Sequence, residues 1–261
     1  WKGHPLIVPA PAPHAPYTCT GEILRACAQL AAEFDVPLHT HLSETLTEVE
    51  DCRRDHGMPV IPWVKKQGLF DAHVLAAHCV HIDEGEMRTL RNAKAGLAHN
   101  PSSNLKLGSG VAPVSKMLSL GLTVGIGTDG PASNNDLDMF EEIRLAALLA
   151  KGTTGDPTAL PATQALLMGT RLGAQAVGMG AITGSLEPGK RADLILVDVD
   201  ALHNTPQFTR DPDAVCARIV YATKSTDVTD VMCNGRWLMR GRELLTLDTQ
   251  ALADGAREYA R

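Results

Sequence analysis

Apolar residues along this chain fall into short runs that end on polar residues, and amphipathic helical stretches separate most of these runs. The apolar runs lie at residues 6–11, 36–42, 74–78, 95–98 and 122–127. Short runs of this kind predict buried parallel strands, and their alternation with helices predicts an α/β fold built from β/α units.

Two of the connecting stretches carry helix signals. Thr20 is placed to cap a helix in which Ile23, Leu24 and the apolar residues at 27, 30, 31 and 34 share one face. Asp83 and Glu86 form the pattern of a capping box, and we expect that helix to close at Gly96. Both helices predict crossovers between parallel strands.

Polar side chains follow each expected strand. They are His14, His41, His78, His99 with Asn100, and Asp129. Ligand-binding groups gather at the carboxyl ends of the strands in a (β/α)8 TIM barrel, and the repeat of roughly 20 to 40 residues fits that fold. A doubly wound open sheet also binds ligands at strand ends, but its phosphate-binding glycine fingerprint is absent from this sequence. We therefore predict part of a barrel.

The pattern changes after about residue 180. The segments GSLEPGKRADLILVD, RIVYA and DVMCNGRWLMRGREL read as short antiparallel strands, with a hairpin at Asn234-Gly235. We predict that residues 1–180 form the barrel part, and that residues 181–261 form a small β-rich domain with a C-terminal tail.

Composition narrows the class of partner. The formal net charge is -6, and Lys and Arg are scattered through the chain, which argues against nucleic acid or an anionic membrane as the partner. No apolar run approaches the roughly 20 residues of a membrane span. The 6 cysteines show no Cys-x-x-Cys pair, so a cytoplasmic location is expected. A small-molecule partner remains.

The segment GIGTDGPASNNDLDMFEE carries the strongest chemical signal. Asp129 follows a buried strand, and Gly127 and Gly130 leave room for a ligand beside its carboxylate. A cation ligand or proton acceptor fits this position. The alternative is an ordinary turn, because Asp-Gly is a common turn dipeptide.

A second candidate group lies in PLHTHLSET. Strand periodicity places His39 and His41 on one face, whereas Glu44 comes from the loop that follows. His41 suits a zinc ligand, and Glu44 suits either a ligand or a proton shuttle. For His39 we expect core packing.

The next two strand ends add further histidines. His78 is a candidate catalytic base or metal ligand, with a structural histidine as the alternative. His99 and Asn100 precede SSNLKLGSG, whose small polar residues suit a substrate-lining loop or an ordinary surface loop.

Taken together, these segments resemble the amidohydrolase superfamily, and most closely its 5-methylthioadenosine/S-adenosylhomocysteine deaminase branch. The segments are PHAPYT, HLSET, AAHCVH, NPSSNLKLGSG, GTDGPASNNDLDMFEE and GSLEPGKRADLILVD. The resemblance implies one divalent metal, zinc or Fe²⁺, with His41 and Asp129 among its ligands. It also implies that Asp129, Glu44 and His78 are catalytic, and that His14, Glu44 and Asp129 contact an adenine nucleoside that loses ammonia.

In this family a further His-x-His pair on the first barrel strand completes the metal site, and this sequence has no counterpart of it. We therefore expect barrel strands 4–8 here, with a companion fragment or a second copy supplying the others. The alternatives are another amidohydrolase reaction, such as a guanine or other ring deaminase or a triazine chlorohydrolase, and a catalytically incomplete fragment.

Overall fold

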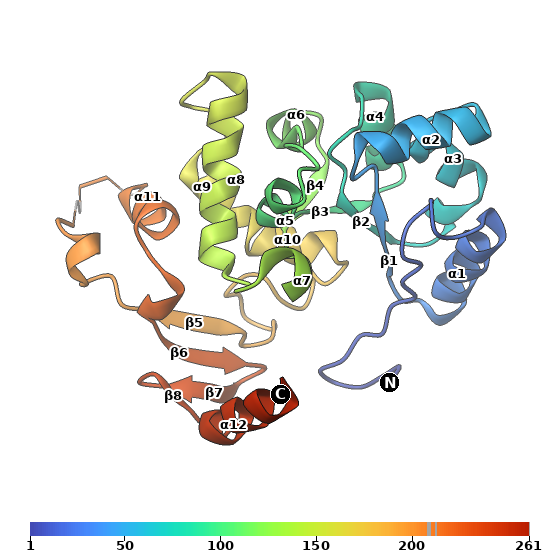
Figure 1. The fold of residues 1–261 in the computed structure, drawn as a ribbon. Helices are drawn as coiled ribbons and strands as arrows, with labels where there is room; N and C mark the ends of the chain where they lie inside the picture. Colours follow the sequence, from blue (N-terminus) through green and yellow to red (C-terminus); the bar gives the residue numbers. More distant parts are fainter. Residues whose placement is uncertain (208–209, 212, 261) are drawn as a thin grey trace.

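The computed structural model describes residues 1–207, 210–211 and 213–260, and in this part of the chain the strands form two separate sheets (Figure 1). The first sheet is parallel, in the order β1-β2-β3-β4. Its strands are β1 (Leu38–Leu42), β2 (Val74–His78), β3 (Gly96–His99) and β4 (Thr123–Ile126). Four of the expected strands are therefore confirmed to within two residues.

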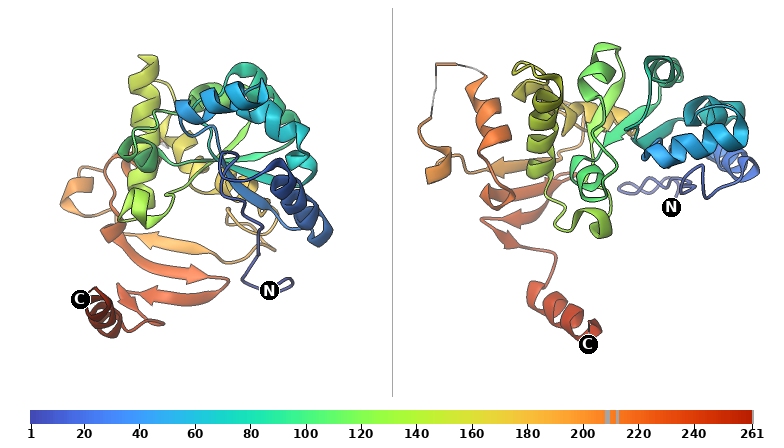
Figure 2. Two further views of the ribbon diagram at one scale, coloured as in Figure 1. Left: turned by 45° about the vertical axis from the view of Figure 1, so that its right-hand side comes forward. Right: turned by 45° about the horizontal axis from the view of Figure 1, so that its top comes forward.

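Helices occupy every connection between the strands of the parallel sheet, as parallel pairing requires. They are α2 (Leu46–His56), α3 (Val60–Lys66), α4 (Glu84–Asn92), α5 (Pro101–Lys106) and α6 (Val114–Ser119). The helix α1 (Gly21–Phe34) forms as predicted, but it precedes β1 and is not a crossover between two strands of this sheet. Leu24 of α1, Leu38 of β1 and Val64 of α3 belong to one buried apolar cluster. Figure 2 shows the helices lying around the outside of the sheet, as in a barrel wall.

Both predicted helix caps are present. The Thr20 hydroxyl accepts from the Ile23 N–H, and Asp83 and Glu86 form a reciprocal capping box on α4. The predicted closure at Gly96 is wrong. Helix α4 ends at Asn92, and Lys94 takes the left-handed conformation with φ 55°.

Gly96 instead begins β3, where it allows a close contact. A Cβ there would lie 1.9 Å from the backbone oxygen of Ala176 in α10 (Arg171–Ala176). Gly125 of β4 meets the same helix, with Gly173 Cα 2.7 Å from the position of a Cβ. The two glycines let α10 pack directly on the backbone of the sheet.

The first expected strand is wrong. Residues 6–11 form no strand, and Leu6, Ile7 and Val8 are exposed. The stretch contains Pro9 and Pro11, and proline has no N–H for a ladder of hydrogen bonds. A single backbone bond links this stretch to β1, from His39 N–H to the Pro11 oxygen.

Helices α7 (Pro131–Asn134), α8 (Met139–Thr154), α9 (Ala162–Met168) and α10 follow β4. The second sheet is antiparallel, in the order β5-β6-β7-β8. Its strands are β5 (Leu194–Val197), β6 (Val228–Cys233), β7 (Arg236–Arg240) and β8 (Glu243–Leu244), and α12 (Thr249–Tyr259) follows them. The first sheet ends with β4 at Ile126 and the second begins with β5 at Leu194, and the division into domains near residue 180 remains a prediction.

The predicted hairpin at Asn234-Gly235 is confirmed. Both residues have positive φ, 48° and 78°, and Cys233 pairs with Arg236 across the turn. The predicted strand RIVYA is wrong, because these residues lie in α11 (Ala214–Tyr221), which packs on α8 and α9. No helix in the described part of the chain is long and apolar enough to cross a membrane.

Candidate metal centre

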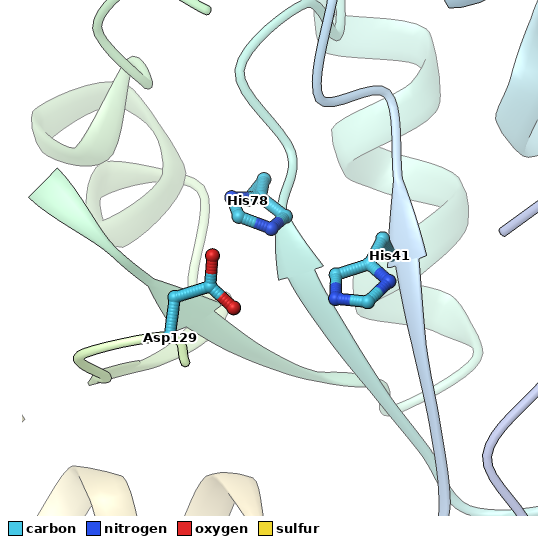
Figure 3. A group of neighbouring side chains, drawn as sticks. All are labelled: His41, His78 and Asp129. Carbon is cyan, nitrogen blue, oxygen red and sulfur yellow. The ribbon is translucent and has the colours of Figure 1, made fainter. Parts of the chain in front are cut away.

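Three of the predicted site residues lie together at the carboxyl ends of the parallel strands. His41 on β1, His78 at the end of β2 and Asp129 in the loop after β4 each offer one ligand atom, and these atoms lie within 4.8 Å of one another. Figure 3 shows the three side chains around a common space. Two imidazoles and a carboxylate are a donor set that suits zinc.

Strand alternation and one backbone contact orient His41. Its Nδ1–H donates to the His14 carbonyl oxygen at 2.6 Å, and the same oxygen accepts from the His41 N–H at 3.1 Å. Because Nδ1 is used in this way, Nε2 keeps its lone pair. The His41 ring is therefore held in the tautomer that binds a metal.

Backbone conformation brings His78 to the cluster. In regular alternation His78 would share the face of Ala76, whereas His41 lies in register with Ala77, on the opposite face. The left-handed conformation of His78, with φ 70°, and of Cys79, with φ 48°, breaks this alternation. The His78 Nδ1–H donates to Asn104 Oδ1 at 2.8 Å, which leaves Nε2 free.

Two serines hold Asp129, which is itself left-handed with φ 62°. Ser103 Oγ–H and Ser133 Oγ–H both donate to Asp129 Oδ2 at 2.7 Å. Burial alone would raise the pKa of the Asp129 carboxyl, but these bonds, the Gly130 N–H and nearby His78 lower it. The carboxylate form is therefore favoured.

Glu44 lies beside the cluster, in the loop between β1 and α2. Its Oε2 is 3.9 Å from His78 Nε2, and Ser109 Oγ–H donates to its Oε1 at 3.3 Å. His14 lies on the other side of His41, with the ring centroids 5.0 Å apart, and its Nδ1 is 2.9 Å from Thr18 Oγ1. All five predicted site residues therefore lie in one region.

The expectation for His39 is wrong. Its side chain is exposed rather than packed in the core, because this face of β1 borders an open cavity. The cavity measures about 410 Å³ and is lined by His39, His41, Asn100 and Asp129 among others. Although the ring reaches solvent through the cavity, the surrounding cavity wall partly desolvates it, and this, together with nearby His41, lowers the pKa of His39.

The structure separates His99 from Asn100. Asn100 lines the cavity, as expected of a substrate-lining residue, whereas His99 is buried and 3% exposed. Burial and nearby His78 lower the pKa of His99 to about 4. His99 is therefore a neutral histidine beneath the site and does not belong to a surface loop.

Four polar residues that orient the site residues are not among the residues predicted from the sequence. Ser103 and Asn104 lie in α5, Ser109 follows that helix, and Ser133 lies in α7. The predicted loop after Asn100 is wrong in its first part, because residues 101–106 form α5. The small hydroxyl and amide side chains of this run are the available signal. Each of these residues instead holds a predicted site residue in position.

This arrangement fits a divalent metal. The Nδ1 atoms of His41 and His78 are both occupied by acceptors, so each ring offers its free nitrogen, and Asp129 is held as a carboxylate. In this structure these three residues form one group of potential ligands in the described part of the chain.

Sequence comparison finds relatives that share a family and a name. The profile of the amidohydrolase family matches residues 2–238. A 5-methylthioadenosine/S-adenosylhomocysteine deaminase of Moorella thermoacetica is 52% identical over 240 residues, which are 92% of this chain and 55% of that protein. The protein of the same name from Desulforudis audaxviator is 47% identical over 249 residues, 95% of this chain and 57% of its own length. The chain spans little more than half the length of these relatives.

Structural comparison agrees. An adenosine deaminase from Xanthomonas campestris with bound zinc superposes with a TM-score of 0.95 at 40% identity, over 100% of this chain and 58% of that one. An atrazine chlorohydrolase from Arthrobacter aurescens, in complex with zinc, superposes with a TM-score of 0.86 at 28% identity, over 96% of this chain and 54% of that one.

Proposed function

Since this chain belongs to the amidohydrolase family, we propose that the protein containing it is a metal-dependent deaminase of adenine nucleosides. The substrates proposed are 5'-methylthioadenosine, S-adenosylhomocysteine and adenosine. The observation that carries the proposal is the cluster of His41, His78 and Asp129, with its free imidazole nitrogens and hydrogen-bonded carboxylate. The names of the two bacterial relatives and of the zinc-bound structure support the substrate class.

His41 and Asp129 would hold the metal, and His78 lies close enough to be a third ligand. Zinc is the metal we propose, with Fe²⁺ as the alternative. A divalent metal bound there would supply the activation of water, because it lowers the pKa of a bound water molecule to about 7.

The side chains of this chain then move protons and orient the substrate. Asp129 Oδ atoms accept the proton of the attacking water, and Glu44 protonates the ring nitrogen beside the carbon that bears the amine. His78 orients the attacking oxygen, and His14 contacts the ribose or its 5' substituent. Water and the nucleoside give ammonia and an inosine-type product, so no Ser or Cys nucleophile is needed.

One specific observation supports a second candidate reaction, hydrolytic dechlorination. The zinc-containing chlorohydrolase shares the fold at a TM-score of 0.86, so hydrolytic dechlorination of a ring is the runner-up. We also propose that a companion segment or a second copy supplies further barrel strands, which is supported by the share of the relatives that the chain spans, 55% and 57%. A cytoplasmic location remains a prediction.

The test is ammonia release from 5'-methylthioadenosine by the purified full-length protein, with metal content measured in parallel. We expect about one zinc per protomer and turnover that Asp129→Asn abolishes, because an amide accepts the proton of water poorly and is a weak zinc ligand. An active, zinc-replete Asp129→Asn variant would contradict the assignment. Turnover of chlorinated triazines alone would favour the runner-up.

A further inference from the structure

Glu48 is a buried carboxylate that binds the loop carrying Glu44. It lies in the first turn of α2 and is 4% exposed. Its Oε2 accepts from the Glu44 N–H at 2.8 Å, and its Oε1 accepts from the Ser43 N–H at 3.2 Å. Both oxygens of one buried side chain are therefore used on two consecutive peptide groups.

This arrangement differs from an ordinary helix cap. In a capping box the carboxylate at the third helical position returns to the N–H of the N-cap residue, as Glu86 does to Asp83 at 3.0 Å in α4. In α2 the N-cap is Thr45, whose N–H also interacts with the Glu48 carboxylate, but the larger interactions reach beyond the cap to the N–H groups of Glu44 and Ser43. Glu48 therefore fixes the loop in addition to any effect on the helix end.

The loop between β1 and α2 contains a strained residue, which the bonds from Glu48 help to stabilise. Ser43 is in the left-handed conformation, with φ 51°, which costs a non-glycine residue about 1 kcal/mol or more. Burial raises the pKa of the Glu48 carboxyl, the N–H groups of Glu44, Ser43 and Thr45 oppose that rise, and the nearby Glu44 carboxylate adds to it. A buried carboxylate and a strained residue are thus retained together at this loop.

The bonds from Glu48 to this loop affect the direction of the Glu44 side chain. With its N–H anchored, Glu44 places its carboxylate between Ser109 Oγ and His78 Nε2, and its side chain is 14% exposed. A misplacement of about 1 Å at a reacting group can lower the rate about 100-fold.

We propose that Glu48 is a positioning residue for Glu44, holding the Ser43–Glu44 peptide so that the Glu44 carboxylate faces His78 and the reacting ring. This inference rests on the proposed function, in which Glu44 transfers a proton to the substrate. The hydrogen bonds of Glu48 are made to Ser43, Glu44 and Thr45, so its effect on the reaction would pass through the loop.

The test compares Glu48→Gln with Glu86→Gln in the full-length, metal-loaded enzyme. Glu86 is the matched control because it is also a buried helix-capping glutamate, 3% exposed, and its contacts are to Asp83 and Ile61. In glutamine an NH2 donor replaces one of the two carboxylate oxygens, so one of the two N–H groups faces a donor in place of its acceptor. We expect both variants to lower the melting temperature.

We expect kcat for ammonia release to fall about 10- to 100-fold in Glu48→Gln and to stay within about twofold of wild type in Glu86→Gln. KM and zinc content should change little in both variants. Glu48→Asp, which keeps the charge but withdraws it by one methylene, should lower kcat in the same way, and it serves where Glu48→Gln does not fold. Equal kcat in the Glu48 and Glu86 variants would overturn the proposal, as would a kcat loss explained by lost zinc.

Crystal structures of wild type and Glu48→Asp give a second, activity-independent readout. A shift of the Glu44 carboxylate by about 1 Å or more supports the positioning role, and an unmoved carboxylate overturns it. If the wild type releases no ammonia from any adenine nucleoside, the proposed function fails, while this comparison still decides the role of Glu48.

Discussion

Acidification should destabilise this protein through His99. The side chain is 3% exposed, and its Nδ1 has no hydrogen-bond partner among the described residues. Burial and nearby His78 lower its pKa from the ordinary histidine value of 6.5 to about 4. The folded protein therefore keeps His99 neutral at pH values where the unfolded chain takes up a proton.

The direction and the size of this pH effect on the free energy of unfolding follow from the different proton uptake of the folded and unfolded states. Between pH 6.5 and about 4 the unfolded state binds more protons at this residue, so the free energy of unfolding falls as the pH falls. The contribution of neutral His99 to the free energy of unfolding is fully present above pH 6.5 and is lost by about pH 4. The difference between pKa values of 6.5 and about 4 corresponds to about 3 kcal/mol in the free energy of unfolding, at about 1.4 kcal/mol for each pH unit.

Urea denaturation followed by circular dichroism, at a series of pH values from about 7.5 to 4, measures this effect. His99→Leu is the reference, because leucine is close in size and does not titrate, so the difference between the two proteins isolates His99. We expect wild type to lose about 3 kcal/mol more than the variant across the series. Parallel curves, within about 0.5 kcal/mol, would refute the reasoning that burial keeps His99 neutral.

Three further substitutions, and one control substitution at Gly152, test the site and the packing. Glu44→Gln should retain zinc and lose turnover in the ammonia assay, and loss of zinc would make Glu44 a ligand instead. Glu142→Ala should lower the free energy of unfolding by about 2 to 4 kcal/mol in urea, because it leaves buried amide donors without an acceptor; a change below about 1 kcal/mol would contradict this. Gly96→Ala should destabilise by about 2 kcal/mol or more, since its Cβ would overlap the Ala176 oxygen, whereas Gly152→Ala, where nothing lies within 4 Å, should not destabilise.

The sequence predicted the parallel sheet well because a buried strand that ends on a polar residue leaves a local pattern. The run at 6–11 had the same apolar content, but its prolines prevent a ladder, and proline content outweighs hydrophobicity there. The RIVYA segment failed for another reason. An apolar run of five residues fits a strand or one side of a helix, and packing against α8 and α9 decides between them.

The site residues were predictable as types at strand ends, but their supports were not. Ser103 and Asp129 lie 26 positions apart, as do His78 and Asn104, so no local pattern joins either pair. His39 was misjudged because alternation gives the face on which a side chain lies and says nothing of what covers that face. Only the three-dimensional arrangement supplies these contacts.

The left-handed backbone at Ser43 and His78 has a consequence for how this protein responds to selection. Glycine adopts such conformations at little cost, so glycine at either position would relieve local strain of about 1 kcal/mol. Glycine in place of His78 would also remove an imidazole from the cluster, and glycine in place of Ser43 would keep the N–H that Glu48 accepts but widen the range of backbone conformations open to the loop beside Glu44. Selection for heat resistance and selection for turnover therefore oppose each other at these two residues, and an engineered thermostable variant should gain its stability elsewhere in the chain.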